Sequence, residues 1–473
     1  MALPPADGKQ REVLALPVGG HTVVLGTAGG GKTLMAIKRA AFLAELCSKN
    51  ERVLLVTFNK ALVAYFKSIS DNELKKVDVR NYHKFAIGYL NSRNLMGFNV
   101  IAPAYDRHRF TKTDLIKKAL SELKSSDPSI TTFQRDVNVF IEEINWIQKM
   151  GIRTLNEYEE VERVGRSGTR ILRNNRKYFW AVLEHYMELR SKKGYKYDLE
   201  DLASYVEDEL EQDTSNRYYK HIVIDEGQDF SPTMLRSLTK AIPSDGSIIF
   251  FGDVAQQIYG GRISWRNAGF KIKDIWYFEQ NYRNTKEIAA LGLAISKSKY
   301  FQGVADMVEP SSPKAEGVLP AVIKFTDEKK EILYHIERAK KEFATQTVGI
   351  LVRSRKDVDN IVAFLRIARA NYQVLHGDMN GFSLTSGISV GTYHSAKGLE
   401  FDTVILPYFT KEKLPDSERI IALEDEEEAM SEEVKLIYVA VTRARRGLII
   451  SYTGELTELL PTNENDLYQE FTI

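Results

Sequence analysis

Short apolar runs alternate along the chain with longer segments whose apolar residues recur every three or four positions. The runs predict buried strands, and they lie at residues 21–25, 221–224, 247–251, 320–325, 348–353, 388–393, 402–407 and 447–452. Strands that alternate with amphipathic helices favour an α/β fold whose parallel sheets are covered on both faces. Because a chain of 473 residues is too long for one compact core, we expect two such sheets.

The segment from residue 111 to residue 210 has a different pattern. Its apolar residues follow the helical period with charges between them, and β-branched runs are few. The pattern is clearest in TKTDLIKKALSELK, DVNVFIEEINWIQKM, NRKYFWAVLEHYMELR and DLEDLASYVEDEL. Because predicted strands lie on both sides of this segment, we expect a helical domain inserted into the first sheet domain.

The octapeptide GTAGGGKT lies between the first apolar run and a helical segment. A strand, a glycine-rich turn and a helix in this order are typical of a phosphate-binding P-loop. Such a loop surrounds phosphate oxygens with backbone N–H groups, and the helix N-terminus adds a favourable dipole. We expect Lys32 to reach the β- and γ-phosphates of a nucleotide and the Thr33 hydroxyl to bind Mg²⁺. The remaining loop residues are Gly26, Thr27, Ala28, Gly29, Gly30 and Gly31.

Two later strand ends predict the other half of the nucleotide site. HIVIDEGQD closes an apolar run on Asp225 and Glu226. We expect Asp225 to hold Mg²⁺ and Glu226 to polarise the attacking water. The next run ends at Asp253 and is followed by Gln256, whose amide is suited to sensing a γ-phosphate.

Together these segments resemble the superfamily 1 helicases of the UvrD/Rep/PcrA type. The motifs occur in that family's order: GTAGGGKT, DEGQD, GDVAQQIY, FEQNYRNT, GTYHSAKGLEFD and YVAVTRARR. The resemblance implies an α/β fold of two RecA-like parallel-sheet cores in tandem, with a helical accessory domain inserted in the first. The expected boundaries are 1–86 and 216–277 for the first core, 87–215 for the insert and 278–473 for the second core. It also implies an ATP-dependent translocase or helicase on single-stranded nucleic acid, with DNA and 3′→5′ polarity favoured and RNA left open.

The resemblance assigns further residues to ATP. Gln10 matches the family's adenine-reading glutamine, Tyr282 is placed to stack on adenine, and Glu400 is placed to contact the ribose. Arg283 and Arg443 match arginine fingers, which would stabilise the charge that develops on the γ-phosphate in the transition state. The implied catalytic set consists of Lys32, Asp225, Glu226, Gln256, Arg283 and Arg443.

Single-stranded nucleic acid is generally held by basic groups on phosphates and by aromatic faces on bases. The residues that match the family's nucleic-acid motifs are Phe58, Asn59, His83, Tyr259, Trp265, Arg266 and His394. Outside the motif context, Phe58 and Tyr259 would be interpreted as core residues. The register of Trp265 stays open, because GGRIS precedes it where the family usually has a single residue. The basic stretch RVGRSGTRILRNNRK is a further candidate contact, with a solvated loop as the alternative.

The chain departs from the family in two places. Only 37 residues separate Arg353 from Gly391, where family members carry a large second accessory domain. That domain is associated with partner contacts and control of unwinding, so the gap leaves room for a protein partner and puts unwinding in question. Leu34 stands where the family often has an arginine near the base, which predicts looser base discrimination.

Two other function classes stay open. The first is a nucleotide switch, scaffold or ATPase subunit in a repair or phage-defence assembly, without autonomous unwinding. The second is a P-loop kinase or phosphotransferase, which would not need Gln256, Arg283 and Arg443 in this order.

Composition adds less. Lys and Arg number 65 against 64 Asp and Glu, so a polyanion would be bound by a local basic surface rather than by net charge. Cys47, the single cysteine, excludes an internal disulfide and leaves no ligand set for a structural zinc. No apolar run reaches the ~20 residues that span a bilayer, and the start lacks a signal-peptide h-region. We therefore expect a cytoplasmic protein without membrane contact, and a solvated loop at the acidic residues 424–428.

Overall fold

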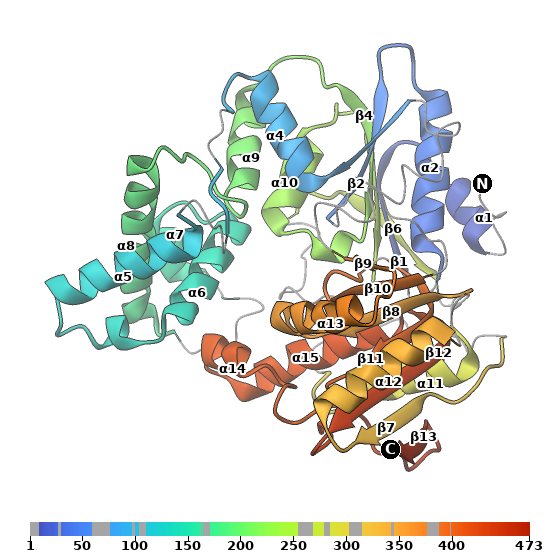
Figure 1. The fold of residues 1–473 in the computed structure, drawn as a ribbon. Helices are drawn as coiled ribbons and strands as arrows, with labels where there is room; N and C mark the ends of the chain where they lie inside the picture. The colour runs from blue at the N-terminus through green and yellow to red at the C-terminus, as the bar shows by residue number, and fades with distance from the viewer. Residues whose placement is uncertain are drawn as a thin grey trace.

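Two parallel sheets, one above the other in Figure 1, and a group of helices beside the upper sheet form the protein. The computed structural model describes residues 9–26, 30–58, 76–96, 100–103, 110–161, 163, 171–253, 268–278, 284–301, 315–341, 345–375, 387–397 and 399–473. The parallel sheets confirm the predicted α/β class. No helix among these residues is long and apolar enough to cross a membrane.

The first sheet has the strand order β3-β2-β4-β5-β1-β6, and every neighbouring pair in it is parallel. Its described strands are β1 (Gly20–Gly26), β2 (Arg52–Thr57), β3 (Val77–Asn81), β4 (Tyr219–Asp225), β5 (Ser247–Gly252) and β6 (Ile272–Phe278). Alternate side chains face opposite sides, so that Val23 and Val24 belong to different apolar clusters. One face is covered by α1 (Lys9–Leu14) and α2 (Lys32–Leu46), as Figure 1 shows. The other is covered by α4 (Tyr82–Ser92), α9 (Leu202–Gln212) and α10 (Pro232–Lys240).

Helix α9 lies within the range 87–215 that the sequence assigns to the helical insert. Its Leu202, Val206 and Leu210 are buried in the same cluster as Leu54 and Ile222 of the first sheet. Helical periodicity reveals an apolar face but not the surface against which that face packs. We therefore propose that the insert ends before α9.

The insert contains α5 (Lys112–Ser126), a 3-10 turn η1 (Thr131–Gln134), α6 (Val137–Met150), α7 (Leu155–Glu160) and α8 (Arg173–Lys192). Together with α9, its helices α5, α6 and α8 confirm the four helical segments predicted from the sequence. The insert has an apolar core of its own, in which the rings of Phe140 and Phe179 stack with centroids 4.4 Å apart. Thr111 begins α5 with a reciprocal capping box to Asp114, which satisfies backbone donors of the first turn.

Two arginines of the basic stretch 163–177 are used inside the insert. Arg163 Nη2 lies 2.6 Å from Oε2 of the fully buried Glu143. Arg176 donates through Nη1 to the carbonyl oxygens of Glu159 (3.1 Å) and Val161 (2.8 Å) at the end of α7. These two side chains therefore hold the fold, and the nucleic-acid contact predicted for the stretch is wrong for them.

The second sheet has the order β13-β7-β12-β11-β8-β10-β9 and is also parallel. Its described strands are β7 (Ala321–Phe325), β8 (Thr347–Val352), β9 (Tyr372–Val374), β10 (Gly387–Thr392), β11 (Phe401–Leu406), β12 (Ala444–Thr453) and β13 (Gln469–Thr472). β7, β8, β10, β11 and β12 confirm the five strands predicted in this half.

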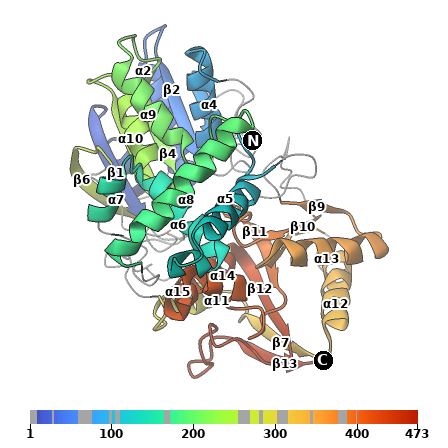
Figure 2. The same ribbon diagram turned by 90° about the vertical axis from the view of Figure 1, so that its left-hand side faces the viewer.

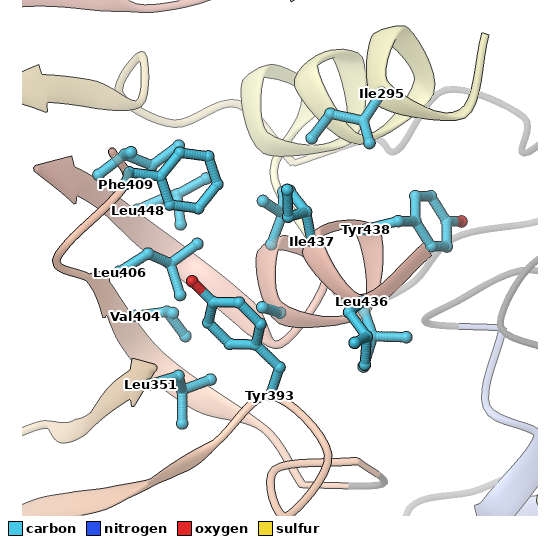
Figure 3. Packing of buried hydrophobic residues seen from close by; sticks show 14 of the residues in the cluster. Ile295, Leu351, Tyr393, Val404, Leu406, Phe409, Leu436, Ile437, Tyr438 and Leu448 are labelled. Atoms are coloured by element: carbon cyan, nitrogen blue, oxygen red, sulfur yellow. The ribbon is translucent and has the colours of Figure 1, made fainter. Parts of the chain in front are cut away.

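Helices cover both faces of the second sheet. Residues of α12 (Glu328–Lys341) and α13 (Arg355–Ile367) are buried on one face. Residues of α11 (Lys286–Ser296) and α15 (Glu426–Val441) are buried on the other. Figure 3 shows Ile437 of α15 between Ile295 of α11 and the sheet residues Leu406 and Leu448, all in one apolar cluster. The first described helix after β6 thus already packs on the second sheet.

The acidic residues 424–428 are not the solvated loop that the sequence suggested. Asp425 is the N-cap of α15 and accepts a hydrogen bond from the backbone N–H of Glu428 (2.8 Å). The following three glutamates occupy the first helical turn, where the positive end of the helix dipole favours negative charge. The loop prediction is therefore wrong for residues 426–428, which begin a helix, whereas Glu424 and Asp425 lie in the turn before it.

The insert contacts the second core through α14 (Ser417–Leu423), which packs against α6 (Figures 1 and 2). Arg135 donates to Glu424, with Nε 3.0 Å from Oε1. Arg419 Nη1 lies 2.9 Å from Oε1 of Glu142 on α6, while its Nε donates to Oε2 of Glu432 on α15 (2.6 Å). Ion pairs therefore connect the insert with the second core directly.

Replacing Gly349 of β8 tests the packing of the second sheet. A Cβ at this position would lie 2.7 Å from the buried ring of Phe401, so Gly349→Ala forces the strand or the ring to move. We expect the free energy of unfolding to fall by about 1–3 kcal/mol, as for other overpacked cores. Urea denaturation measures the change. Gly19→Ala is the control, because nothing lies within 4 Å of its Cβ, and an unchanged midpoint for Gly349→Ala would contradict the packing.

Candidate nucleotide and nucleic-acid site

The carboxyl ends of the first sheet's parallel strands meet at one edge, and the predicted nucleotide residues gather there. Lys32 follows β1, Asp225 ends β4 and Asp253 follows β5. In the sheet β5 lies between β4 and β1, so the three strand ends are neighbours although the chain connects them through the long insert. Open parallel sheets bind their ligands outside this edge.

Lys32 and Thr33 begin α2 after Gly31, whose positive φ of 78° suits glycine. Lys32 is nearly buried, and its Nζ donates to the carbonyl oxygen of Gly26 (2.9 Å) and lies 3.6 Å from Oδ2 of Asp253. The Thr33 hydroxyl donates to Oδ2 of Asp225 (2.9 Å). The two predicted magnesium ligands are thus adjacent.

One hydroxyl and one carboxylate form a donor set that fits Mg²⁺, which keeps several waters and takes few protein ligands. The described residues contain no cluster of three or more acidic, histidine or cysteine side chains that would enclose a metal ion. The site thus matches a cation that is held jointly by the protein and by nucleotide phosphates.

Glu226 is held at a sharp bend between β4 and the 3-10 turn η2 (Gly227–Asp229), where its own φ is 52°. Burial and the adjacent Glu226 carboxylate raise the pKa of Asp225 to about 8. Burial acts on the pKa of Glu226 in the same direction, but nearby positive charges bring that pKa below its usual value. The charges belong to Lys397, Arg443 and Lys32. These positive charges therefore favour the ionised form of Glu226, which its predicted role in polarising water requires.

Gln228 connects two of these strand ends, and it is a residue of DEGQD that the sequence analysis did not select. Its Oε1 accepts the backbone N–H of Asp253 (2.9 Å), and its Nε2 donates to Oε2 of Glu226 (2.5 Å). Gln228 thus fixes the Glu226 carboxylate relative to the end of β5. The glutamine's place beside two carboxylates is a signal that could have identified it.

Arg443 is brought to this site from the second core. It follows α15 and is almost fully buried, with Nε donating to the carbonyl oxygen of Val439 (3.0 Å) and Nη1 to that of Leu399 (3.4 Å). Its charge is among those that lower the pKa of Glu226, which lies on the first core. The structure therefore places Arg443 near the predicted hydrolytic carboxylate.

Gln10 and Glu400 have partners of their own in the structure. Gln10 Nε2 donates to the carbonyl oxygen of Gly30 (3.4 Å), and a Cβ at Gly31 would come within 2.6 Å of it. Glu400 pairs with Arg445, whose Nη2 lies 2.9 Å from Oε2. Gln10 thus rests on the P-loop, while the adenine and ribose contacts of the two residues stay predictions.

The predicted nucleic-acid residues that the structure describes also follow strands. Phe58 follows β2 and His83 lies just after β3, with their ring centroids 5.6 Å apart and both side chains half-buried. Phe58 also contacts Phe230 (6.4 Å) and packs against the core, as the alternative interpretation expected. His394 follows β10 of the second sheet; burial and nearby positive charges lower its pKa to about 3, so its ring is neutral.

The other predicted site residues lie outside the part of the chain that the structure describes, and their roles stay predictions. They are Thr27, Ala28, Gly29, Asn59, Gln256, Tyr259, Trp265, Arg266, Tyr282 and Arg283.

Residues 6–283 match the UvrD/REP helicase N-terminal domain, more than half of the chain, and residues 371–455 match the UvrD-like helicase C-terminal domain. The chain belongs to the UvrD/REP helicase family. The match confirms the predicted family and the predicted class of enzyme.

Three relatives of this chain have names that describe them as helicases. "Putative ATP-dependent DNA helicase YjcD" of Bacillus subtilis is 27% identical over 59% of this chain and 37% of its own length. A "Probable DNA helicase" of Mycoplasma pneumoniae is 22% identical over 91% of this chain and 80% of its own length. DNA helicase II of Haemophilus influenzae is 26% identical over 60% of this chain and 39% of its own. The chain thus spans well under half of two of these relatives.

One similar solved structure is the C-terminal domain of a possible DNA helicase from Lactobacillus plantarum WCFS1. It is 21% identical and covers 40% of this chain and 98% of that one, with a TM-score of 0.29. This score is too low to support a comparison of folds.

Replacing Gln228 with alanine tests its connecting role. The change leaves the buried N–H of Asp253 without this acceptor and frees the Glu226 carboxylate. Because Glu226 is then no longer held in position to orient the attacking water, we expect kcat for ATP hydrolysis to fall about 10-fold, which corresponds to about 1.4 kcal/mol in the barrier. Steady-state ATPase kinetics measure it. Gln373→Ala is a matched control, because Gln373 donates to Ser389 within the second sheet (2.8 Å) and should leave kcat unchanged. Equal kcat for both variants would contradict the role of Gln228.

Proposed function

We propose that this helicase-family protein is an ATP-dependent translocase on single-stranded nucleic acid, most simply DNA, with 3′→5′ polarity. One observation carries the proposal: the charges around Glu226 come from both cores, Lys32 from the first and Lys397 and Arg443 from the second. A site assembled across two cores responds to their closing and opening. Hydrolysis linked to such motion is what translocation along a strand requires.

The described residues would have different roles in hydrolysis. Thr33 and Asp225 would hold Mg²⁺ beside the phosphates, and Lys32 would exchange its contact with Gly26 for phosphate oxygens. Bound Mg²⁺ would neutralise charge on the β- and γ-phosphates. Glu226, ionised and held by Gln228, would orient the attacking water. Arg443 would stabilise the charge that develops on the γ-phosphate, an electrostatic role suited to a buried guanidinium.

The nucleic acid would run across the carboxyl edges of both sheets. Phe58 and His83 present rings at this edge of the first sheet, and the neutral His394 lies at the same edge of the second. Stacking of a base on such a ring contributes ~1–3 kcal/mol. If both cores bind the strand, each cycle in which the cores close and open would advance the strand.

A second candidate is an ATPase subunit or nucleotide switch of a repair or defence assembly, without strand separation. The observation that favours it is the short connection between β8 and β10, which contains α13 and β9 instead of a second accessory domain. A partner protein would then supply what that domain does in other members of the family.

The test measures ATP turnover with no nucleic acid and with single- and double-stranded DNA and RNA. Displacement of a labelled strand from substrates with a 3′ or a 5′ tail follows. We expect single-stranded DNA to stimulate turnover at least about 10-fold and 3′-tailed substrates to be preferred. Lys32→Ala, which removes the predicted phosphate contact, should abolish turnover. Stimulation without displacement would favour the second candidate, and turnover indifferent to every nucleic acid would contradict the proposed translocase.

Arg443→Ala separates transition-state stabilisation from nucleotide binding. We expect ATP affinity to change less than about 3-fold while kcat falls by about 10³, as for other arginine fingers. Fluorescent-nucleotide titration and single-turnover hydrolysis measure the two quantities. Arg443→Lys keeps the charge and should retain more activity. Affinity that falls in step with kcat would argue for a binding role instead.

A further inference from the structure

A buried ion pair joins the two cores beside the hydrolytic carboxylate. Lys397 Nζ, from the turn after β10 in the second core, donates to Oδ1 of Asp229 on η2 in the first. Both side chains are almost wholly buried, with exposed fractions of 5% and 3%. Burial raises the pKa of Asp229 to about 6, so the carboxylate is charged at neutral pH.

Burial makes this contact sensitive to how the cores are arranged. Removing a charged group from water is costly unless an oppositely charged partner is in place. Because Lys397 and Asp229 belong to different cores, movement of one core relative to the other separates them and returns both to water. The pair is therefore complete in one arrangement of the cores.

A backbone hydrogen bond connects each partner of the ion pair to a residue with a predicted role. The N–H of Asp229 donates to the carbonyl oxygen of Glu226 (3.0 Å), and the N–H of Lys397 donates to that of His394 (3.2 Å). Single turns thus connect His394 to Lys397 and Asp229 to Glu226. The ion pair completes a continuous physical path from a candidate nucleic-acid contact to the carboxylate that handles water.

We propose that Lys397 is a positioning residue, which transmits nucleic-acid binding at the His394 turn to Glu226 through its ion pair with Asp229. The inference rests on the proposed function, because it presupposes that a single strand stimulates hydrolysis. Lys397 touches neither the nucleotide nor the strand in this scheme. Its effect should appear in the stimulated rate and not in either affinity.

The experiment compares the whole chain with Lys397→Met, Asp229→Asn and the double variant. For each protein, kcat and KM for ATP are measured with and without oligo(dT), and fluorescence anisotropy gives Kd for the same oligonucleotide. We expect each single variant to lower the stimulated kcat at least about 10-fold, with KM and Kd changed less than about 3-fold. The double variant should lose no more than the worse single variant, because the two residues act as one unit.

Two further variants separate this role from a general loss of stability. Lys397→Arg keeps the charge and should retain most of the stimulation. Lys413→Met removes a lysine that pairs with Asp357 inside the second core (2.9 Å) and should leave stimulation unchanged. Thermal unfolding identifies variants that do not fold. If Lys397→Met does not fold, the stimulated rates of Asp229→Asn and Lys397→Arg test the proposal instead.

The possible failures differ from one another. A wild-type protein whose turnover ignores oligo(dT) would overturn the proposed function and this inference with it. A stimulated wild type together with equally stimulated Lys397→Met or Asp229→Asn would overturn the inference alone. So would losses that multiply in the double variant, or a Kd for oligo(dT) that rises in step with the lost rate.

Discussion

The hydrogen bond from Thr33 to Asp225 joins residues 192 positions apart, and the nucleotide site depends on the constraint that allows it. In a parallel sheet all carboxyl ends share one edge, so the start of α2, which follows β1, and the last residue of β4 meet there although a long stretch of chain lies between them. The helices of the insert have their own apolar core, so they interrupt the sequence without interrupting the sheet. The first half of the site is thus set by sheet topology.

The second half of the site consists of positively charged groups that the second core brings to Glu226. Asp225 and Glu226 are adjacent buried carboxylates, and the charge of Glu226 raises the pKa of Asp225. Of the three positive charges that lower the pKa of Glu226, Lys32 lies on the first core, while Lys397 and Arg443 come from the second core. In the first core by itself, Glu226 would lose two of these three positive charges. Two of the three positive charges that favour the ionised form of Glu226 thus come from the second core.

The sequence predicts the residues of this site that belong to local motifs. It does not predict those that depend on contacts between distant segments of the chain. Lys32, Thr33, Asp225 and Glu226 could be predicted because a strand followed by a glycine turn or by acidic residues determines where they lie. Lys397 and Asp229 pair across 168 residues, and no periodicity encodes such a contact. The same limit explains α9, whose apolar face gave no indication that the first sheet would cover it. The arginines at 163 and 176 show that a basic run predicts a binding surface only where its side chains are free of buried acceptors.

The ion pairs between the insert and the second core bear on how far the cores move. Arg419 contacts Glu142 of the insert and Glu432 of α15, the helix after which Arg443 follows. A displacement of the second core therefore changes the surroundings of Glu226, through Lys397 and Arg443. It also changes the contact with the insert, through Arg419. The two connections differ in burial. The side chains of Arg419 and Glu142 are 23% and 28% exposed, so they already contact water while paired, whereas Lys397 and Asp229 are almost wholly buried and become hydrated only when they separate. Separation of the cores therefore changes the solvation of the Lys397–Asp229 pair more than that of the pair with the insert.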